Sequence, residues 1–265
     1  MNRRRFLRLG SLGSLGLGLE AAPAAASCIV LWQRGGMSHL DTFDMKPDAP
    51  ADVRGEFREI PTNVPGIRIC EHLPRTARIM DKLTIIRSMC SSETNHERAG
   101  WKLAGMPPAL HAPDAEAALH MIERGARFVS LSTGQADYDT HSDNFGRLKN
   151  YLLPAFDRAF SKLITGLDSR GMLSSTLVVA LTEFGRTPRI NALGGRDHHS
   201  RAWSVVLAGA GLPGGRVLGA TDRTGTEVTD LPVSPEDLLA TIYAVLRIRP
   251  EGKLAAGRVI EPVLG

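Results

Sequence analysis

The chain has 265 residues, of which 43% are hydrophobic and 23% are charged, and its formal net charge is +4. This composition is typical of a globular protein with one large domain or two small ones. The excess of positive charge is small and concentrated near the N-terminus, so it excludes the basic surface that nucleic-acid binding requires.

The first residues, Asn2-Arg3-Arg4-Arg5-Phe6-Leu7-Arg8, resemble a twin-arginine export signal. A short Leu/Gly-rich segment follows and ends in Ala24-Ala25-Ala26, which is typical of a signal cleavage site. We expect residues 1–26 to be a removable signal that engages the twin-arginine translocase, and residues 27–265 to form one periplasmic or secreted domain. The apolar part is too short for a stable membrane span. The alternative is an amphipathic structural helix.

Strands and helices alternate along the rest of the chain. Apolar runs predict strands at 28–32, 83–87, 127–132, 177–181 and 202–207, with an edge strand at 214–220. Helical spacing predicts helices at 71–82, 95–103, 114–124 and 145–170, and a final helix that begins at Ser234. The proline-rich residues 46–68 predict a surface loop. The alternation predicts an α/β fold with a mostly parallel central sheet and helices on both faces.

Histidines and carboxylates follow the ends of the predicted strands. Because the carboxyl ends of parallel strands meet at one edge of a sheet, we expect these side chains to converge there. His96, after the second strand, is as consistent with a structural role as with a ligand role. The candidate metal ligands are His39, Asp41, Asp139, His141, Glu183, Asp197 and His198.

This mixture of imidazoles and carboxylates favours zinc, manganese or calcium, as one or two divalent cations. Arg186 could clamp the oxygens of a phosphoryl group, since its planar fork matches phosphate. Ser38 and Thr42 are the candidate hydroxyl nucleophiles, although no base can be assigned to either. The alternative is a solvated loop with a chance Asp-His pair. Three cysteines without Cys-x-x-Cys spacing allow at most one disulfide, whose pairing the sequence does not give, and we expect buried free thiols instead.

Several blocks of the sequence resemble the DUF1501 family, exported bacterial proteins common in planctomycetes. The resemblance covers almost all of the predicted mature chain, in order. It implies a fold like that of alkaline phosphatases and sulfatases, with metals at the carboxyl ends of the strands. The blocks are Gly35-Gly36-x-Ser38-His39-x-Asp41-Thr42-Phe43-Asp44, Arg54-Gly55-Glu56-Phe57 with Thr62-Asn63-Val64-Pro65-Gly66, Asn95-His96-Glu97-Arg98-Ala99, Asp139-Thr140-His141-x-Asp143-Asn144-Phe145, Glu183-Phe184-Gly185-Arg186-Thr187-Pro188 and Gly195-Arg196-Asp197-His198.

The resemblance also shows two departures. Glu183 stands where the superfamily usually has an Asp-His pair, whereas Asp139, His141 and His198 match its ligand positions. In addition, only about ten residues, from Gly105 to Asp114, stand where typical members have a long middle region. A shortened member would have a thin active-site roof, and its strands 83–87 and 127–132 would pair.

These observations predict an exported, hydrolase-like protein that cleaves a phosphate or sulfate ester of a small molecule or glycan with a divalent metal. A non-catalytic, degenerate binding or scaffold protein that keeps the fold is the alternative. A truncated and poorly folding fragment is a third interpretation.

Overall fold

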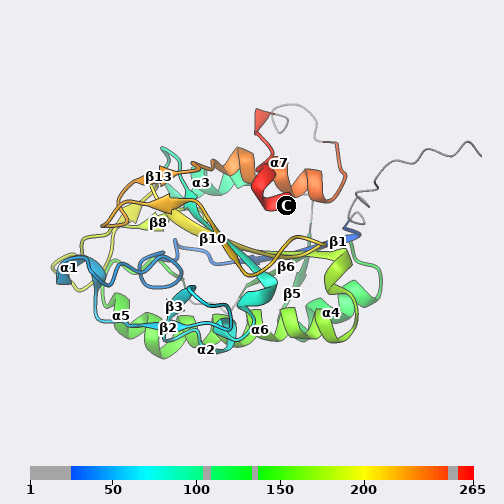
Figure 1. The fold of residues 1–265 in the computed structure, drawn as a ribbon, viewed down its shortest axis with the longest axis horizontal. Helices are drawn as coiled ribbons and strands as arrows, with labels where there is room; N and C mark the ends of the chain where they lie inside the picture. The colour runs from blue at the N-terminus through cyan, green and yellow to red at the C-terminus, as the bar shows by residue number, and fades with distance from the viewer. Residues whose placement is uncertain (1–24, 104–108, 133–136, 250–255) are drawn as a thin grey trace, which may run out of the picture.

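The computed structural model describes residues 25–103, 109–132, 137–249 and 256–265, so nearly all of the predicted export signal lies outside the described residues. Its centre is a seven-stranded sheet in the order β11-β4-β10-β7-β1-β6-β5 (Figure 1). Within this sheet every strand runs parallel except β10, which is antiparallel to both neighbours. The α/β prediction is therefore confirmed. The strands are β1 Ser27–Trp32, β4 Leu83–Met89, β5 Leu110–Ala112, β6 Phe128–Ser132, β7 Thr176–Leu181, β10 Trp203–Gly209 and β11 Arg216–Leu218.

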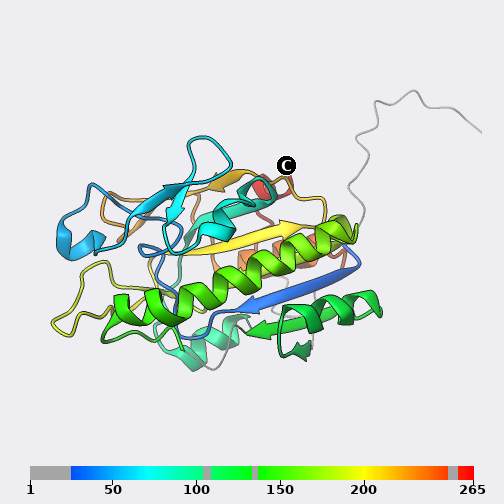
Figure 2. The same cartoon turned by 90° about the horizontal axis from the view of Figure 1, so that it is seen from below.

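Helices cover both faces of the sheet because its central strands are apolar on both sides. In β1, Ile29 and Leu31 pack into one core, whereas Cys28 and Val30 pack into the other. Figures 1 and 2 show α4 and α6 beneath the sheet and α3 and α7 above it. These helices are α3 His96–Leu103, α4 Ala115–Glu123, α6 Leu153–Ser169 and α7 Pro235–Val245.

The predicted starts of two helices are confirmed, because the capping residues identified in the sequence cap these helices in the structure. The side chain of Asp114 accepts a hydrogen bond from the backbone of Ala117 at 2.8 Å and so begins α4. Ser234 and Asp237 form a reciprocal capping box at the start of α7. The predicted helix 145–170 is present as α5 Asn144–Arg147, a π-helical segment Leu148–Leu152 and α6, with a proline in the first turn of α6.

The segment before β4 differs from prediction. Instead of one helix over 71–82, it forms the short α2 Pro74–Ala77 and a 3-10 turn at Met80–Lys82. The reason is a tertiary contact: the buried carboxylate of Asp157 on α6 accepts hydrogen bonds from the backbone N–H of Arg75 and of Thr76, at 3.0 and 2.7 Å. This contact holds the start of α2 against α6.

Two further expectations were wrong, and one strand was not predicted. The strands predicted at 83–87 and 127–132 do not pair, because β4 pairs with β10 and β11 while β6 pairs with β1 and β5. The strand β5 was not predicted. The predicted loop 46–68 contains α1 Ala51–Arg54 and part of a hairpin. Other short elements are β2 Glu59–Pro61, β3 Arg68–Cys70, β8 Gly185–Arg186, β9 His198–His199, β12 Ala220–Thr221, β13 Val228–Asp230, a 3-10 turn Leu173–Ser175 and α8 Glu261–Leu264.

The cysteines are free thiols, as expected. Burial raises the pKa of Cys28 and of Cys70 to about 12, so both are unreactive thiols at neutral pH. Within the described ranges, no helix is both long and apolar enough to cross a bilayer.

Replacing Asp157 with alanine should lower the free energy of unfolding by about 2–3 kcal/mol, because buried N–H groups at the start of α2 lose their acceptor. Urea unfolding of the wild type and variant measures this loss. Arg158→Ala is the matched control, since the adjacent, exposed side chain should matter by less than about 0.5 kcal/mol. Equal losses in the two variants would contradict the anchoring role of Asp157.

Candidate metal centre

The site lies where four parallel strands end at one edge of the sheet. Gly35 follows β1, His96 follows β4, Asp139 follows β6 and Glu183 follows β7. A small ladder adds the fifth contribution, because β8 pairs with β9 and sets Arg186 opposite His198. Segments far apart in the sequence therefore meet at this edge.

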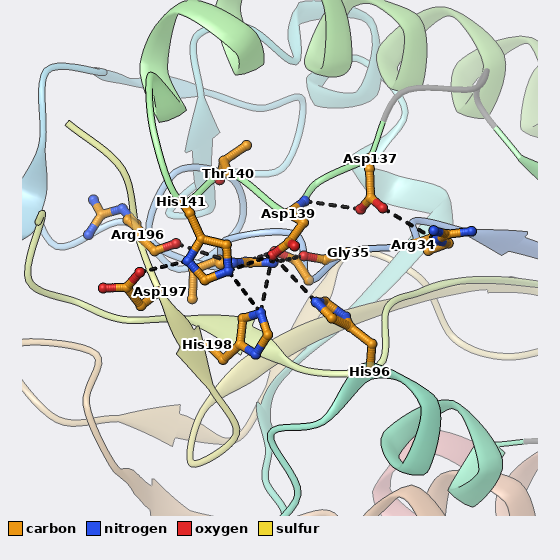
Figure 3. Close-up of polar contacts among 12 residues, drawn as sticks. Arg34, Gly35, His96, Asp137, Asp139, Thr140, His141, Arg196, Asp197 and His198 are labelled. Atoms are coloured by element: carbon orange, nitrogen blue, oxygen red, sulfur yellow. Dashed lines mark hydrogen bonds and ion pairs between the residues drawn. The ribbon is translucent and has the colours of Figure 1, made fainter. Parts of the chain in front are cut away.

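The carboxylate of Asp139 is the centre of the cluster (Figure 3). Its Oδ1 lies 3.0 Å from Nε2 of His141, 3.2 Å from Nε2 of His198 and 3.4 Å from Nε2 of His96. The two Nε2 atoms of His141 and His198 are 3.0 Å apart. His96, Asp139 and His198 form a group that could hold a metal ion.

Each imidazole binds an acceptor through its other nitrogen. Nδ1 of His96 lies 2.7 Å from Oε1 of Glu183, and Nδ1 of His141 lies 2.7 Å from Oδ1 of Asp197. Nδ1 of His198 lies 2.8 Å from the carbonyl oxygen of residue 94. Carboxylates and carbonyls only accept hydrogen bonds, so each Nδ1 carries the proton.

This choice of tautomer leaves an Nε2 lone pair on each of the three imidazoles, and all three Nε2 atoms lie within 3.4 Å of Oδ1 of Asp139. Two of them, on His141 and His198, face each other at 3.0 Å, and Nε2 of His96 is buried without a hydrogen-bond partner within the described chain. Burial, and secondarily the charge of Arg186, lower the pKa of His198, which keeps it neutral. Converging lone pairs repel unless a cation or a proton lies between them, so the donor set fits a metal.

Arg186 supports this cluster from beneath. Its side chain is fully buried and bonds to the carboxylate of Asp139 and to the carbonyl of Gly35; Nε donates to the carbonyl of Gly36 at 3.1 Å. Burial alone would raise the pKa of Asp139, but the hydrogen bond and charge of Arg186 lower it to about 2. In the structure Arg186 thus orients Asp139, and its fully buried guanidinium is not exposed to clamp the oxygens of a phosphoryl group.

Two glycines allow the loops to approach so closely. Gly35 has φ +99°, and a Cβ on it would overlap the side chain of Asp137 and the backbone of Asp139. A Cβ on Gly195 would overlap the carbonyl of His141. The buried ring of Phe184 forms an apolar floor, with its centroid 4.7 Å from that of His96 and 4.8 Å from that of His198.

The other predicted site residues lie outside this cluster. Asp41 is fully buried and bonds to Arg196, while His39 is fully buried and its Nε2 lies 2.8 Å from the carbonyl oxygen of Gly225. Ser38 and Thr42 are also buried, and the Thr42 hydroxyl donates to the Ser38 carbonyl at 2.7 Å. The structure therefore brings five of the predicted site residues together: Asp139, His141, Glu183, Asp197 and His198. The four that follow β1, namely Ser38, His39, Asp41 and Thr42, lie outside this cluster.

Sequence reasoning did not include His96 in the ligand set, although its position after β4 was a usable signal. It also treated Glu183 and Asp197 as direct ligands, whereas in the structure both lie behind an imidazole as hydrogen-bond acceptors. The backbone carbonyl that orients His198 could not be predicted from the sequence, because any residue at position 94 has such a carbonyl.

The sequence matches the family described as "Protein of unknown function (DUF1501)" over residues 25–105 and 114–258. The match is interrupted between them, around the point where the sequence predicts a shortened middle region. No curated protein matches the chain.

Solved structures that are partly similar to this chain include a hydrolase, a synthase and a protein in the alkaline phosphatase superfamily. The lipoteichoic acid synthase LtaP from Listeria monocytogenes is 9% identical with a TM-score of 0.46, over 92% of this chain and 76% of that one. A protein in the alkaline phosphatase superfamily from Vibrio parahaemolyticus is 10% identical with a TM-score of 0.45, over 92% and 74%. The phosphonate monoester hydrolase SpPMH from Silicibacter pomeroyi is 18% identical with a TM-score of 0.30, over 43% of this chain and only 21% of its own length. These partial likenesses assign no activity to this chain.

Replacing Arg196 with methionine should lower the free energy of unfolding by about 3–5 kcal/mol, because it leaves the buried carboxylate of Asp41 without its partner. Thermal or urea unfolding measures the loss. Arg189→Met, at an exposed arginine of the same loop, is the control and should change stability by less than about 0.5 kcal/mol. A wild-type-like Arg196→Met protein would show that the buried pair does not hold the loops.

Proposed function

The chain belongs to the DUF1501 family, and from that premise we propose that it is an exported, metal-dependent hydrolase of phosphate or sulfate esters. One observation carries the metal dependence: two imidazoles, each with its proton committed on Nδ1, face each other through bare Nε2 atoms at 3.0 Å beside a carboxylate oxygen. A divalent cation is the group that best satisfies such a set of donors.

The spacing of the donors supports a small cation with nitrogen and oxygen ligands. Zinc bonds of about 2.0–2.1 Å in a tetrahedron place neighbouring donor atoms about 3.3 Å apart. The distances from Oδ1 of Asp139 to the three Nε2 atoms, 3.0, 3.2 and 3.4 Å, fall around this value. We therefore propose His96, Asp139 and His198 as ligands. We add His141 to this group, because its Nε2 lies 3.0 Å from both Oδ1 of Asp139 and Nε2 of His198.

A divalent cation at this place would polarise a phosphoryl or sulfuryl oxygen and activate a nucleophile. The protein's own residues orient the donors: Glu183 and Asp197 fix two imidazole tautomers, and Arg186 holds Asp139 ionised. Because the hydroxyls of Ser38 and Thr42 are buried, we propose water as the nucleophile. The open side of the cluster, where the side chain of Asp139 is 32% exposed, would receive a small-molecule or glycan ester.

We further propose that the protein is periplasmic or secreted. The support is the sequence of residues 1–26, with its paired arginines and its Ala24-Ala25-Ala26 end. Expression of the full chain in wild-type cells and in cells without the twin-arginine translocase would test this. Cleaved protein outside the cytoplasm in wild-type cells alone is the expected result.

The first experiment is elemental analysis of residues 27–265, purified without chelator. We expect about one equivalent of zinc, manganese or calcium in the wild type, and its loss in an Asp139→Ala, His198→Ala double variant. His120→Ala, at an exposed histidine on α4, is the control and should keep the metal. Absence of metal from the wild type would remove the hydrolase proposal and favour a non-catalytic scaffold protein that keeps the fold.

Asp197→Asn should weaken metal binding by about 10–100-fold, because His141 loses the carboxylate that fixes its tautomer. Competition with a coloured chelator measures the affinity. Glu123→Gln is a matched control, since Glu123 makes the same kind of contact, at 2.9 Å, to Nδ1 of the exposed His120. Unchanged affinity in Asp197→Asn would argue against an orienting role for that carboxylate.

A further inference from the structure

A basic groove of about 480 Å³ lies between α2 and α6, beneath the sheet (Figure 1). Four basic side chains line it: Arg75 in α2, Arg78 just after α2, and Arg158 and Lys162 in α6. Among the described residues, no acidic side chain lines it. The groove is remote from the metal centre, because the helical stretch that begins at Asn144, after the loop of the centre, runs for about 20 Å before it reaches Arg158.

The three arginines of the groove carry charges that the protein does not neutralise. Arg75, Arg78 and Arg158 are exposed. Within the described part of the chain, none of their side chains forms a hydrogen bond or an ion pair. Three guanidinium groups in one groove therefore have their donors available to a ligand.

Lys162 adds to this positive charge. It lies one helical turn after Arg158, where like charges repel. Its Nζ is 3.0 Å from Oε2 of Glu116, but Oε1 of the same carboxylate lies 3.0 Å from Nη2 of Arg170, so two cations share one negative charge. A local excess of this kind is compatible with the small net charge of the chain, because carboxylates elsewhere offset it. An anion in the groove would relieve the repulsion.

Asp157 fixes the groove without neutralising it. Its buried carboxylate accepts hydrogen bonds at the start of α2: Oδ2 from the backbone N–H of Arg75 at 3.0 Å, and Oδ1 from the backbone N–H and the hydroxyl of Thr76 at 2.7 and 2.8 Å. The acid next to Arg158 in the sequence thus faces inward. It holds α2 against α6, so that Arg75 and Arg78 line the same groove as Arg158.

The lining suits a sugar chain that carries acidic esters. The planar fork of a guanidinium matches the oxygens of sulfate and phosphate groups, and several such groups on one ligand are needed to meet three separate arginines. The lining also includes the exposed Thr165, whose hydroxyl donates to the carbonyl of Ser161 at 2.8 Å. Its oxygen keeps lone pairs that can accept a hydrogen bond from a sugar hydroxyl.

A bilayer and a nucleic acid match this lining less well. Membrane-surface binding uses exposed aromatic and aliphatic side chains, and single-stranded nucleic acids stack on aromatic rings. Among the described residues, no aromatic side chain lines the groove, and its aliphatic residue, Ile79, is buried.

We propose that the groove between α2 and α6 binds a polyanionic glycan chain that carries sulfate or phosphate groups. This site is separate from the metal centre and goes beyond the proposed ester hydrolysis. Bound there, the glycan would hold the protein on a charged polysaccharide, whichever ester the metal centre cleaves.

Binding of fluorescein-labelled dextran sulfate to residues 27–265, followed by anisotropy, tests the proposal. Ala25 aside, both hydrophobic cores consist of residues in this range, so the protein without its export signal keeps the fold. We expect saturable binding that weakens as salt is raised, because salt screens the charges, and no binding of uncharged dextran. The Asp139→Ala, His198→Ala variant should bind dextran sulfate as the wild type does.

Two double variants locate the site. Arg78→Gln, Arg158→Gln should bind dextran sulfate about tenfold more weakly, because two of the three unpaired guanidinium groups are lost. Arg124→Gln, Arg223→Gln is the matched control: it removes the same charge from exposed arginines outside the groove and should bind within about twofold of the wild type. All four side chains are exposed, so both variants should unfold in urea as the wild type does.

Equal losses in the two double variants would show a response to net charge alone and would overturn the proposal. No binding of dextran sulfate would overturn it as well. Tighter binding, at equal charge concentration, to phosphatidylglycerol vesicles or to a single-stranded oligonucleotide would overturn the assignment of a glycan. None of these results would affect the proposed function, because the metal content tests that separately.

Discussion

An imidazole has two ring nitrogens and, when neutral, one proton, and the centre depends on where three such protons lie. Glu183, Asp197 and a backbone carbonyl each take one Nδ1–H, so the opposite nitrogens of three rings turn toward Asp139 as acceptors. These anchors come from the end of β7, from the loop before β9 and from the segment after β4. The sheet thus fixes the acceptors first, and the acceptors then determine which atoms meet at the centre.

Two buried arginines hold the loops that carry this arrangement. Arg186 ties the turn after β1 to the turn after β6, and Arg196 ties Asp41 to the loop at 187–188 and to α1. A buried guanidinium is costly to desolvate, and only full satisfaction by carboxylate and carbonyl oxygens makes it favourable. Because all their hydrogen bonds are made inside the protein, the guanidinium groups of Arg186 and Arg196 do not face solvent. These two buried guanidinium groups therefore hold the loops in place and are not exposed to a substrate.

The sequence predicted the parallel strands, most helices and the edge where imidazoles and carboxylates gather, because apolar runs and their order carry that information. It could not separate Asp41 from Asp139, since both follow a strand and stand near a histidine. What separates them is a partner 155 residues away, Arg196, which closes one carboxylate and leaves the other open. It also could not tell a ligand from the acceptor behind it, as for Glu183. The prediction of one helix over 71–82 was wrong for a similar reason: the buried carboxylate of Asp157 on α6, which is distant in sequence, determines where α2 begins.

The position of β1 in the sheet has a consequence for how the chain folds. Although β1 comes first among the strands, it lies between two that come much later: Cys28 pairs with Phe128 of β6 and with Leu177 of β7. One backbone edge of β1 thus has no partner until about half of the polypeptide has been made, and the other has none until about two thirds has been made. Such distant pairings impose a high contact order and slow folding. On the ribosome, this strand must wait for its neighbours, and the metal centre is among the last features of the molecule to assemble.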